Sequence, residues 1–294
     1  MLARTRDLPW GGLSTLVAAF FLVYAEILIS LSRDWSTDDN YSHGFLVIPA
    51  AAYLAWLRRN TLRSLPVKGS TLGALIVGAS LALLLAGTAG IELFVTRVSM
   101  VGVIAGSIVF LFGWAHLRVL ALPVGFLVLM IPLPAILFNQ IAFPLQLLAT
   151  RFGVSGLELA SIPVLREGNV IVLANTTLEV AEACSGIRSL ISLFTLAVLY
   201  GQFAEDRLLN RIAIVASAVP IAIVANGLRV AGTGAAAHFY GAETATGFFH
   251  SFSGWIVFGA SFALILLTHR VLQFLVPAQS EPPAPASPQM QVSH

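Results

Sequence analysis

Apolar runs, each close to the length needed to cross a bilayer, recur along most of this 294-residue chain. A transmembrane helix needs about 20 such residues, within a range of roughly 17 to 25. Most charged residues fall between the runs, which predicts a bundle of membrane helices joined by loops. The pattern predicts about eight spans, the second and fifth of them short: Gly12–Leu31, Gly44–Leu57, Leu72–Ala89, Val98–Trp114, Leu117–Ile131, Cys184–Phe203, Arg211–Gly232 and Ser251–Thr268.

The segment between the fifth and sixth runs has a different pattern. Its first part, Ala135–Phe152, is apolar but interrupted by polar residues and a proline, which favours an interfacial or re-entrant helix over a span. Its second part has β-branched runs on either side of Gly168-Asn169, a pair typical of a hairpin turn. The predicted fold is an all-α integral membrane bundle with a small extracytoplasmic β element. The expected strands are Ile162–Arg166, Val170–Leu173 and Thr177–Val180.

Composition agrees with a membrane protein and excludes several other classes. Charged residues make up 10% of the chain and hydrophobic residues 57%, with a mean hydropathy of +0.88. A soluble domain has about 25% charged residues. The net charge of +2 gives no indication of nucleic-acid binding, which needs a basic patch. The one cysteine, Cys184, rules out an intrachain disulfide and a CxxC metal site, and we expect no metal and no cofactor.

Basic residues predict the orientation, because Lys and Arg of short loops stay on the cytoplasmic side. Following the runs in alternate directions, most of the 16 basic residues gather on one face. Both termini are therefore expected in the cytoplasm. Residues 1–275 form the predicted membrane domain, and the Pro-rich residues 276–294 are expected to be a disordered cytoplasmic tail.

Three polar residues of the last three runs lie at one predicted depth. Each is separated by 18 to 21 residues from a charged or ionisable residue at the cytoplasmic boundary. At 1.5 Å per residue this is a rise of about 27 to 32 Å, close to one hydrocarbon thickness. Consecutive spans of alternating direction are expected to be neighbours, so a thiol, a guanidinium and an imidazole converge near the outer boundary. The three residues are Cys184, Arg229 and His250.

Together these groups suit nucleophilic catalysis. A helix N-terminus or a nearby cation favours the thiolate form of a cysteine, and Cys184 opens its predicted helix with Arg188 one turn further along. The imidazole of His250 can take the thiol proton and later donate one to a leaving amine. Arg229 cannot act as a base, but it can stabilise an oxyanion or bind a substrate carboxylate.

Each of these residues also has a structural interpretation. Cys184 can be an inert small hydrophobe, Arg229 a snorkelling interface anchor, and His250 a boundary histidine bonded to a carbonyl. The agreement in depth and the polar surroundings of the thiol, from Glu182 to Ser189, favour the chemical interpretation.

Other polar residues leave two interpretations open. Glu182 can orient His250 or Arg229, or it can be a solvated acid at a helix N-terminus. His43 can line a substrate entrance or cap a helix. Glu26, inside the first run, can be functional or can pair with an Arg that faces the bundle.

No HExxH motif occurs, and all five Asp are expected outside the spans, which disfavours metalloprotease and aspartyl mechanisms.

The blocks around these residues resemble those of the exosortases, integral-membrane cysteine transpeptidases or proteases. The resemblance covers roughly residues 38 to 260. It implies that Cys184 is the nucleophile and that Arg229 and His250 complete the site. The blocks are Glu182-Ala183-Cys184-Ser185-Gly186-Ile187-Arg188-Ser189-Leu190, Asn226-Gly227-Leu228-Arg229-Val230, His250 with Gly254-Trp255, Tyr41-Ser42-His43-Gly44, Pro132-Leu133-Pro134, Pro144-Leu145-Gln146, and Glu167-Gly168-Asn169-Val170-Ile171. The supporting residues expected from these blocks are Glu182, Ser185, Arg188, Asn226 and His43.

The resemblance also implies a function. It implies an enzyme of the bacterial inner membrane, with its site facing the periplasm, that cleaves and sorts secreted proteins through a Cys acyl-thioester. Its substrates would carry a PEP-CTERM-like signal, made of a Pro-Glu-Pro-like motif, a transmembrane helix and a basic end, with a link to exopolysaccharide and biofilm. The expected partners are this substrate and the lipid bilayer. Two alternatives are a polysaccharide transporter or assembly component without covalent chemistry, and a membrane scaffold in which Cys184 is dispensable.

Overall fold

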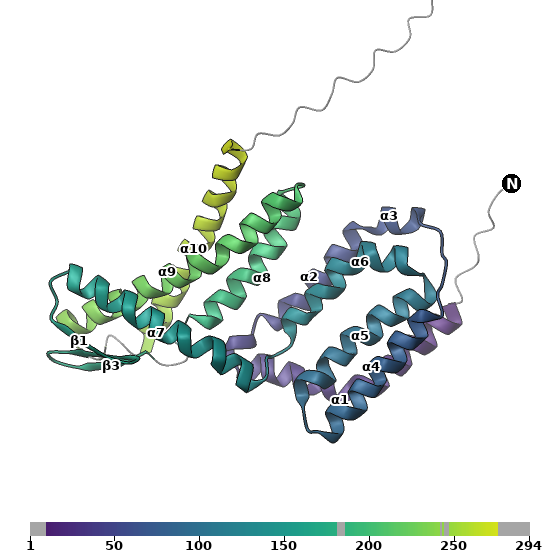
Figure 1. The fold of residues 1–294 in the computed structure, drawn as a ribbon, viewed down its shortest axis with the longest axis horizontal. Coiled ribbons are helices and arrows are strands. Elements are labelled where there is room, and N and C mark those ends of the chain that lie inside the picture. Colours follow the sequence, from purple (N-terminus) through teal and green to yellow (C-terminus); the bar gives the residue numbers. More distant parts are fainter. Residues whose placement is uncertain (1–9, 181–185, 242, 244–246, 276–294) are drawn as a thin grey trace, which may run out of the picture.

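The computed structural model describes residues 10–180, 186–241, 243 and 247–275. In Figure 1 most helices run side by side in two groups, and α7 lies crosswise between them. The first group contains α1 (Trp10–Thr37), α2 (Gly44–Leu57), α4 (Leu72–Ala89), α5 (Leu93–Leu111) and α6 (Trp114–Phe126). The second contains α8 (Ile187–Ala204), α9 (Leu208–Tyr240) and α10 (Gly247–Leu275). The predicted class, a helical membrane bundle with a small sheet, is confirmed.

The apolar helices follow the predicted runs in order, although not every one is long enough to cross a bilayer. Within the described residues, six helices are long and apolar enough to cross a bilayer, or seven if α6 and α7 form one bent span. The remaining apolar helix, α2, has only 14 residues, which is about 21 Å of rise. The short helix α3 (Arg59–Ser64) follows α2 directly.

The break between α6 and α7 (Ala135–Leu159) turns the chain by 82°. The end of α6 tightens into the 3-10 helix η2 (Leu127–Met130), and Pro132-Leu133-Pro134 follow it without helical structure. Because proline lacks an N–H and restricts the residue before it, this stretch cannot continue the helix. Helix α7 lies crosswise after this bend (Figure 1), as a broken span or a re-entrant segment would, and its interfacial or re-entrant position stays a prediction.

The predicted strands are present as one antiparallel sheet in the order β1-β2-β3. Gly168, in the two-residue turn between β1 and β2, has φ +63°, a conformation that glycine adopts without strain. Ile171 of β2 is fully buried against Leu157 of α7 and Val230 of α9. The strands are β1 (Val164–Glu167), β2 (Val170–Leu173) and β3 (Thr177–Glu179).

The two ends of the molecule carry different elements. The start of α1, α3, the α8–α9 loop and the end of α10 lie at one end, here called the α3 end (Figure 1). The α4–α5 turn, α7 and the sheet lie at the opposite end, here called the sheet end. Helices that cross the bilayer in alternate directions are expected to place these loops at opposite ends in this way.

Helices α1 and α5 extend beyond the predicted spans. Helix α5 begins at Leu93 rather than Val98, because Oε2 of Glu92 accepts a hydrogen bond from the Val95 N–H and caps the helix. Arg97 therefore lies within α5 and is buried. Helix α1 continues to Thr37 and includes Asp34, so the expectation that every Asp lies outside the spans is wrong at this position.

Close packing between α4 and α5 depends on small residues at the contact. A methyl group at Gly73 would lie 2.6 Å from the Gly106 carbonyl oxygen and 2.5 Å from Cα of Phe110. Both are backbone atoms and cannot move aside unless the helices separate. Gly78, on another face of α4, has no atom within 4 Å of the same position.

We predict that Gly73→Ala lowers the thermal unfolding temperature of the detergent-solubilised protein, since overpacking costs about 1–3 kcal/mol. The matched control is Gly78→Ala, which adds the same methyl to the same helix and is expected to leave that temperature unchanged or slightly higher. Equal unfolding temperatures for the two variants would contradict the close α4–α5 contact.

Candidate functional site

Helix α8 begins in close contact with α9. Gly186 has φ +82°, and a methyl group there would lie 2.7 Å from Cγ and 2.9 Å from Nδ2 of Asn226. Asn226 is buried on α9. A side chain at position 186 would therefore be strained by its backbone conformation and would also collide with this amide.

Arg229, one turn after Asn226, connects α9 to α10. Its Nε donates to Oγ of Ser253 at 3.4 Å. A methyl group at Gly254 would lie 3.5 Å from a terminal nitrogen of Arg229, so the guanidinium lies directly against the backbone of α10. The blocks around Gly186, Arg229 and Gly254 thus meet at one place in the structure.

Several predicted site residues lie outside the described residues. These are Cys184, Glu182 and Ser185, within 181–185, and the side chain of His250. The backbone of His250 belongs to α10, three residues before Ser253. The roles expected for these four residues stay predictions.

Arg188 turns from the start of α8 toward the first group of helices. Its Nη1 lies 3.1 Å from Oδ2 of Asp39, in the 3-10 helix η1 (Asp39–Tyr41), and its Nε lies 3.5 Å from Oδ1 of Asn40. Both partners of the ion pair are exposed, 41% for Arg188 and 77% for Asp39, so it adds little stability. Its importance is positional, because it brings the Tyr41–Gly44 block beside α8.

His43 is buried at the start of α2 and makes no helix-capping hydrogen bond. Its Nε2–H donates to the Leu129 carbonyl at 3.0 Å. Burial lowers the pKa of the imidazole below its ordinary value of 6.5, although the backbone carbonyls of Leu129 and Asn40 oppose the shift. The neutral ring therefore joins α2 to η2.

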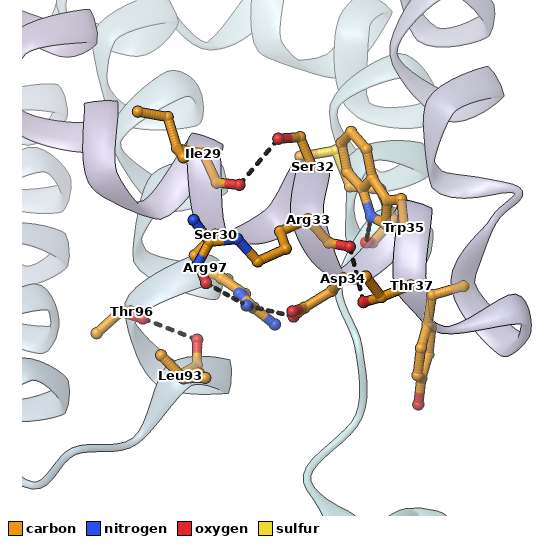
Figure 2. Close-up of polar contacts among 12 residues, drawn as sticks. Ile29, Ser30, Ser32, Arg33, Asp34, Trp35, Thr37, Leu93, Thr96 and Arg97 are labelled. Atoms are coloured by element: carbon orange, nitrogen blue, oxygen red, sulfur yellow. Dashed lines mark hydrogen bonds and ion pairs between the residues drawn. The ribbon is translucent and has the colours of Figure 1, made fainter.

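An ion pair between a buried arginine and a half-buried aspartate lies at the sheet end, and the sequence did not predict it. Figure 2 shows Arg97 extending from α5 toward α1, where its Nη2 lies 2.6 Å from Oδ2 of Asp34 and 3.1 Å from Oγ of Ser30. Arg97 is 2% exposed. The signal that could have revealed it is Glu92, whose capping position starts α5 early enough to include Arg97.

An open pocket of about 490 Å³ adjoins this ion pair. It lies between the end of α1, η1, the α4–α5 turn and the link from η2 to α7. Its wall combines carboxylates and amides with apolar side chains such as Leu133 and Phe138.

The model of the transmembrane exosortase family (Exosortase_EpsH) matches residues 35–267. The chain belongs to this family. The match starts in α1 and ends in α10, so it includes every block described above. Among curated proteins and solved structures, none matches the chain.

Two further features of this exosortase concern the other polar residues. Glu26 is exposed on α1, and no ion pair to it occurs among the described residues, so the Arg partner of the structural interpretation is not found there. Among residues 10–180, 186–241, 243 and 247–275, no group of three or more His, Cys, Asp or Glu side chains is arranged to hold a metal ion.

We predict that Gly186→Ala lowers the unfolding temperature and changes the rate of maleimide labelling at Cys184. The added methyl is strained by the positive φ and collides with Asn226. Gly168→Ala is the control, since Gly168 also has positive φ but no atom within 4 Å of the added methyl. Strain alone costs about 1–2 kcal/mol. A Gly186→Ala protein that matches Gly168→Ala in both unfolding temperature and labelling rate would contradict the contact.

We predict that stability falls as the pH drops through 6.5, partly because of His43. The pKa of His43 is lowered in the folded state, so the unfolded chain binds the proton more tightly and acid favours unfolding. His43→Gln keeps a donor for Leu129 without titrating. Its unfolding temperature, followed from pH 8 to about pH 5, is expected to depend less on pH than that of the wild type; parallel curves would assign the acid loss to other groups.

Proposed function

We propose that this exosortase is a membrane-embedded cysteine transpeptidase or protease with Cys184 as its nucleophile. The observation that supports it best is the meeting of three chain segments. Gly186 lies against Asn226, and Arg229 bonds to Ser253. These contacts join the segments that contain the thiol, the guanidinium and the imidazole.

Covalent geometry limits how far the undescribed groups can be from these contacts. One residue lies between Cys184 and Gly186, so their Cα atoms are two virtual bonds and no more than about 7 Å apart. His250 precedes Ser253 by three residues of α10, close to one helical turn. A catalytic set of Cys184, Arg229 and His250 is therefore compatible with the positions of their neighbours.

In the proposed reaction the Cys184 thiolate attacks a peptide carbonyl of the substrate. Arg229 stabilises the oxyanion of the tetrahedral intermediate. The carbon–nitrogen bond then breaks, the leaving amine takes a proton from His250, and an acyl-thioester remains on Cys184. A second nucleophile attacks the thioester, its proton passes to His250, and the thiolate is released. Asn226 and Gly186 act as positioning residues for the start of α8.

The proposed substrate is a secreted protein held by a C-terminal transmembrane helix. Family membership suggests a PEP-CTERM-like signal and a connection to exopolysaccharide. We place the protein in a bacterial inner membrane with both termini cytoplasmic and the site facing the periplasm. The grouping of α3, which carries Arg59 and Arg63, with the α8–α9 loop at one end supports this orientation under the positive-inside rule.

We predict that Cys184→Ala abolishes C-terminal processing of a tagged substrate ending in a Pro-Glu-Pro motif, a transmembrane helix and a basic end. Immunoblotting of both proteins expressed together in cells measures the cleaved fraction. A thiol nucleophile cannot be replaced by a methyl group, so we expect no product above background.

The structural control for this experiment is the unfolding temperature of the purified Cys184→Ala protein, which is expected to equal that of the wild type. Normal processing by a folded Cys184→Ala protein would rule out the thiol mechanism. It would favour a transport or scaffold function instead.

A further inference from the structure

We propose that the open edge of strand β3 binds the substrate as an additional strand of the sheet. The ligand is an extended peptide, the segment of the substrate that precedes its transmembrane helix. Sheet edges bind peptides in this way through main-chain hydrogen bonds. This inference rests on the proposed function, to which it adds the place where the substrate main chain binds.

Backbone hydrogen bonds beside β3 show which of its residues face β2. The Val180 N–H donates to the Asn169 carbonyl at 2.9 Å, and the Leu173 N–H donates to the Thr176 carbonyl at 2.8 Å. In an antiparallel strand, residues that exchange hydrogen bonds with the neighbour alternate with residues that do not. Thr176 and Val180 therefore face β2, and Leu178, midway between them, does so as well.

The other two residues of β3, Thr177 and Glu179, direct their N–H and C=O groups away from β2. Both residues are exposed. Among the described residues, no hydrogen bond is found to any of these four backbone groups. A row of unpaired N–H and C=O groups is a template for pairing with another extended chain. An extended peptide presents the complementary donors and acceptors at the same spacing.

The edge is held rigidly by the rest of the sheet. Val180, directly after β3, is buried in one apolar cluster with Leu157 of α7 and Val230 of α9. Nδ2 of Asn175, in the β2–β3 turn, donates to the His238 carbonyl near the end of α9 at 3.1 Å. A strand that is already ordered loses little conformational entropy when a peptide pairs with it.

Strand β3 leads along the chain to the proposed nucleophile. Cys184 follows Glu179 by five residues, so their Cα atoms are no more than about 18 Å apart. An extended peptide of about five residues spans the same distance. The strand lies at the sheet end (Figure 1), where the proposed orientation has the periplasm and hence the secreted part of the substrate. A segment paired with the edge therefore extends as far as the thiol.

Pairing with an edge tolerates proline at every second position. Only alternate residues of the added strand turn their N–H groups toward β3, and the N–H groups between them face solvent. Proline lacks an N–H. A Pro-Glu-Pro segment therefore loses no hydrogen bond to β3 when its glutamate faces the edge, because both prolines then face away. The proposed substrate motif is compatible with this mode of binding.

The first test removes one outward N–H from the edge. Glu179→Pro deletes this donor without deleting a bond to β2, and Glu179→Ala removes the same side chain but keeps the donor. The probe is a fluorescent synthetic peptide made of a Pro-Glu-Pro segment, a transmembrane helix and a basic end. Fluorescence anisotropy measures its affinity for Cys184→Ala protein in nanodiscs. We expect Glu179→Pro to bind about three- to tenfold more weakly than Glu179→Ala, because one main-chain hydrogen bond is lost.

The matched control lies on the opposite edge, which β1 forms. Arg166 pairs with Ile171, and Ile171 faces β3 through its pairing with Leu178. The Arg166 N–H therefore also points away from the sheet, and Arg166→Pro makes the same backbone change at the other edge. We expect Arg166→Pro and Arg166→Ala to bind the peptide equally.

The second test changes the peptide and leaves the protein intact, so its result does not depend on how the proline variants fold. Single residues are N-methylated from the glutamate of the motif to the start of the transmembrane helix. Strand pairing predicts that affinity falls at the glutamate and at every second residue after it, and is unchanged at the residues between.

The outcomes separate this proposal from the proposed function. Equal binding by Glu179→Pro and Glu179→Ala, an equal loss in Arg166→Pro, or a loss that does not alternate along the peptide overturns the edge site. A dimer that Glu179→Pro dissociates, with peptide affinity unchanged, assigns the edge to a second copy of the chain instead. Peptide that binds at the edge but is not cleaved by the wild type counts against the proposed function alone, since binding is measured without the thiol.

Discussion

Helices in a bilayer gain little from burying apolar surface against each other, because lipid tails are equally apolar, so their association depends on close backbone approach. Helix α9 meets this constraint through glycines at its contact with α7. A methyl group at Gly227 would lie 3.1 Å from Cγ of Phe152, and one at Gly234 would lie 2.9 Å from Leu157. This packing sets the depth and rotation of α9, and hence the positions of Asn226 against Gly186 and of Arg229 against Ser253. The polar contacts of the candidate site depend on it.

The two groups of helices carry different features of the molecule. The second group carries the residues proposed for catalysis. The first group forms most of the pocket beside the Arg97–Asp34 ion pair. Helix α7 and the short η1 connect them, the latter through Arg188 and Asp39. The contact between the Tyr41–Gly44 block and the start of α8 therefore depends on the relative position of the two groups.

Local pattern was enough to predict the helices and the hairpin. Long apolar runs have few alternatives to a membrane helix, and Gly168-Asn169 between β-branched runs has few alternatives to a tight turn. The start of α5 has a local signal in the cap residue Glu92, but the pairing of Arg97 with Asp34, 63 residues apart, forms only in the folded protein and was not predictable from local pattern. The contact of Arg188 with η1 is nonlocal for the same reason. The segments of Gly186, Asn226 and Arg229 meet in the structure, whereas the common depth of Cys184, Arg229 and His250, which rested on counting residues from the charged loops, stays a prediction.

The Arg97–Asp34 pair has a consequence for biosynthesis. An Arg near the centre of an inserting helix costs about 2.5 to 3.5 kcal/mol, and one near the end costs less. When α5 leaves the ribosome, α1 is already in the membrane, and its Asp34 can neutralise the incoming guanidinium. Insertion of the first turns of α5 is thus cooperative with α1, because Asp34 is synthesised and inserted before Arg97.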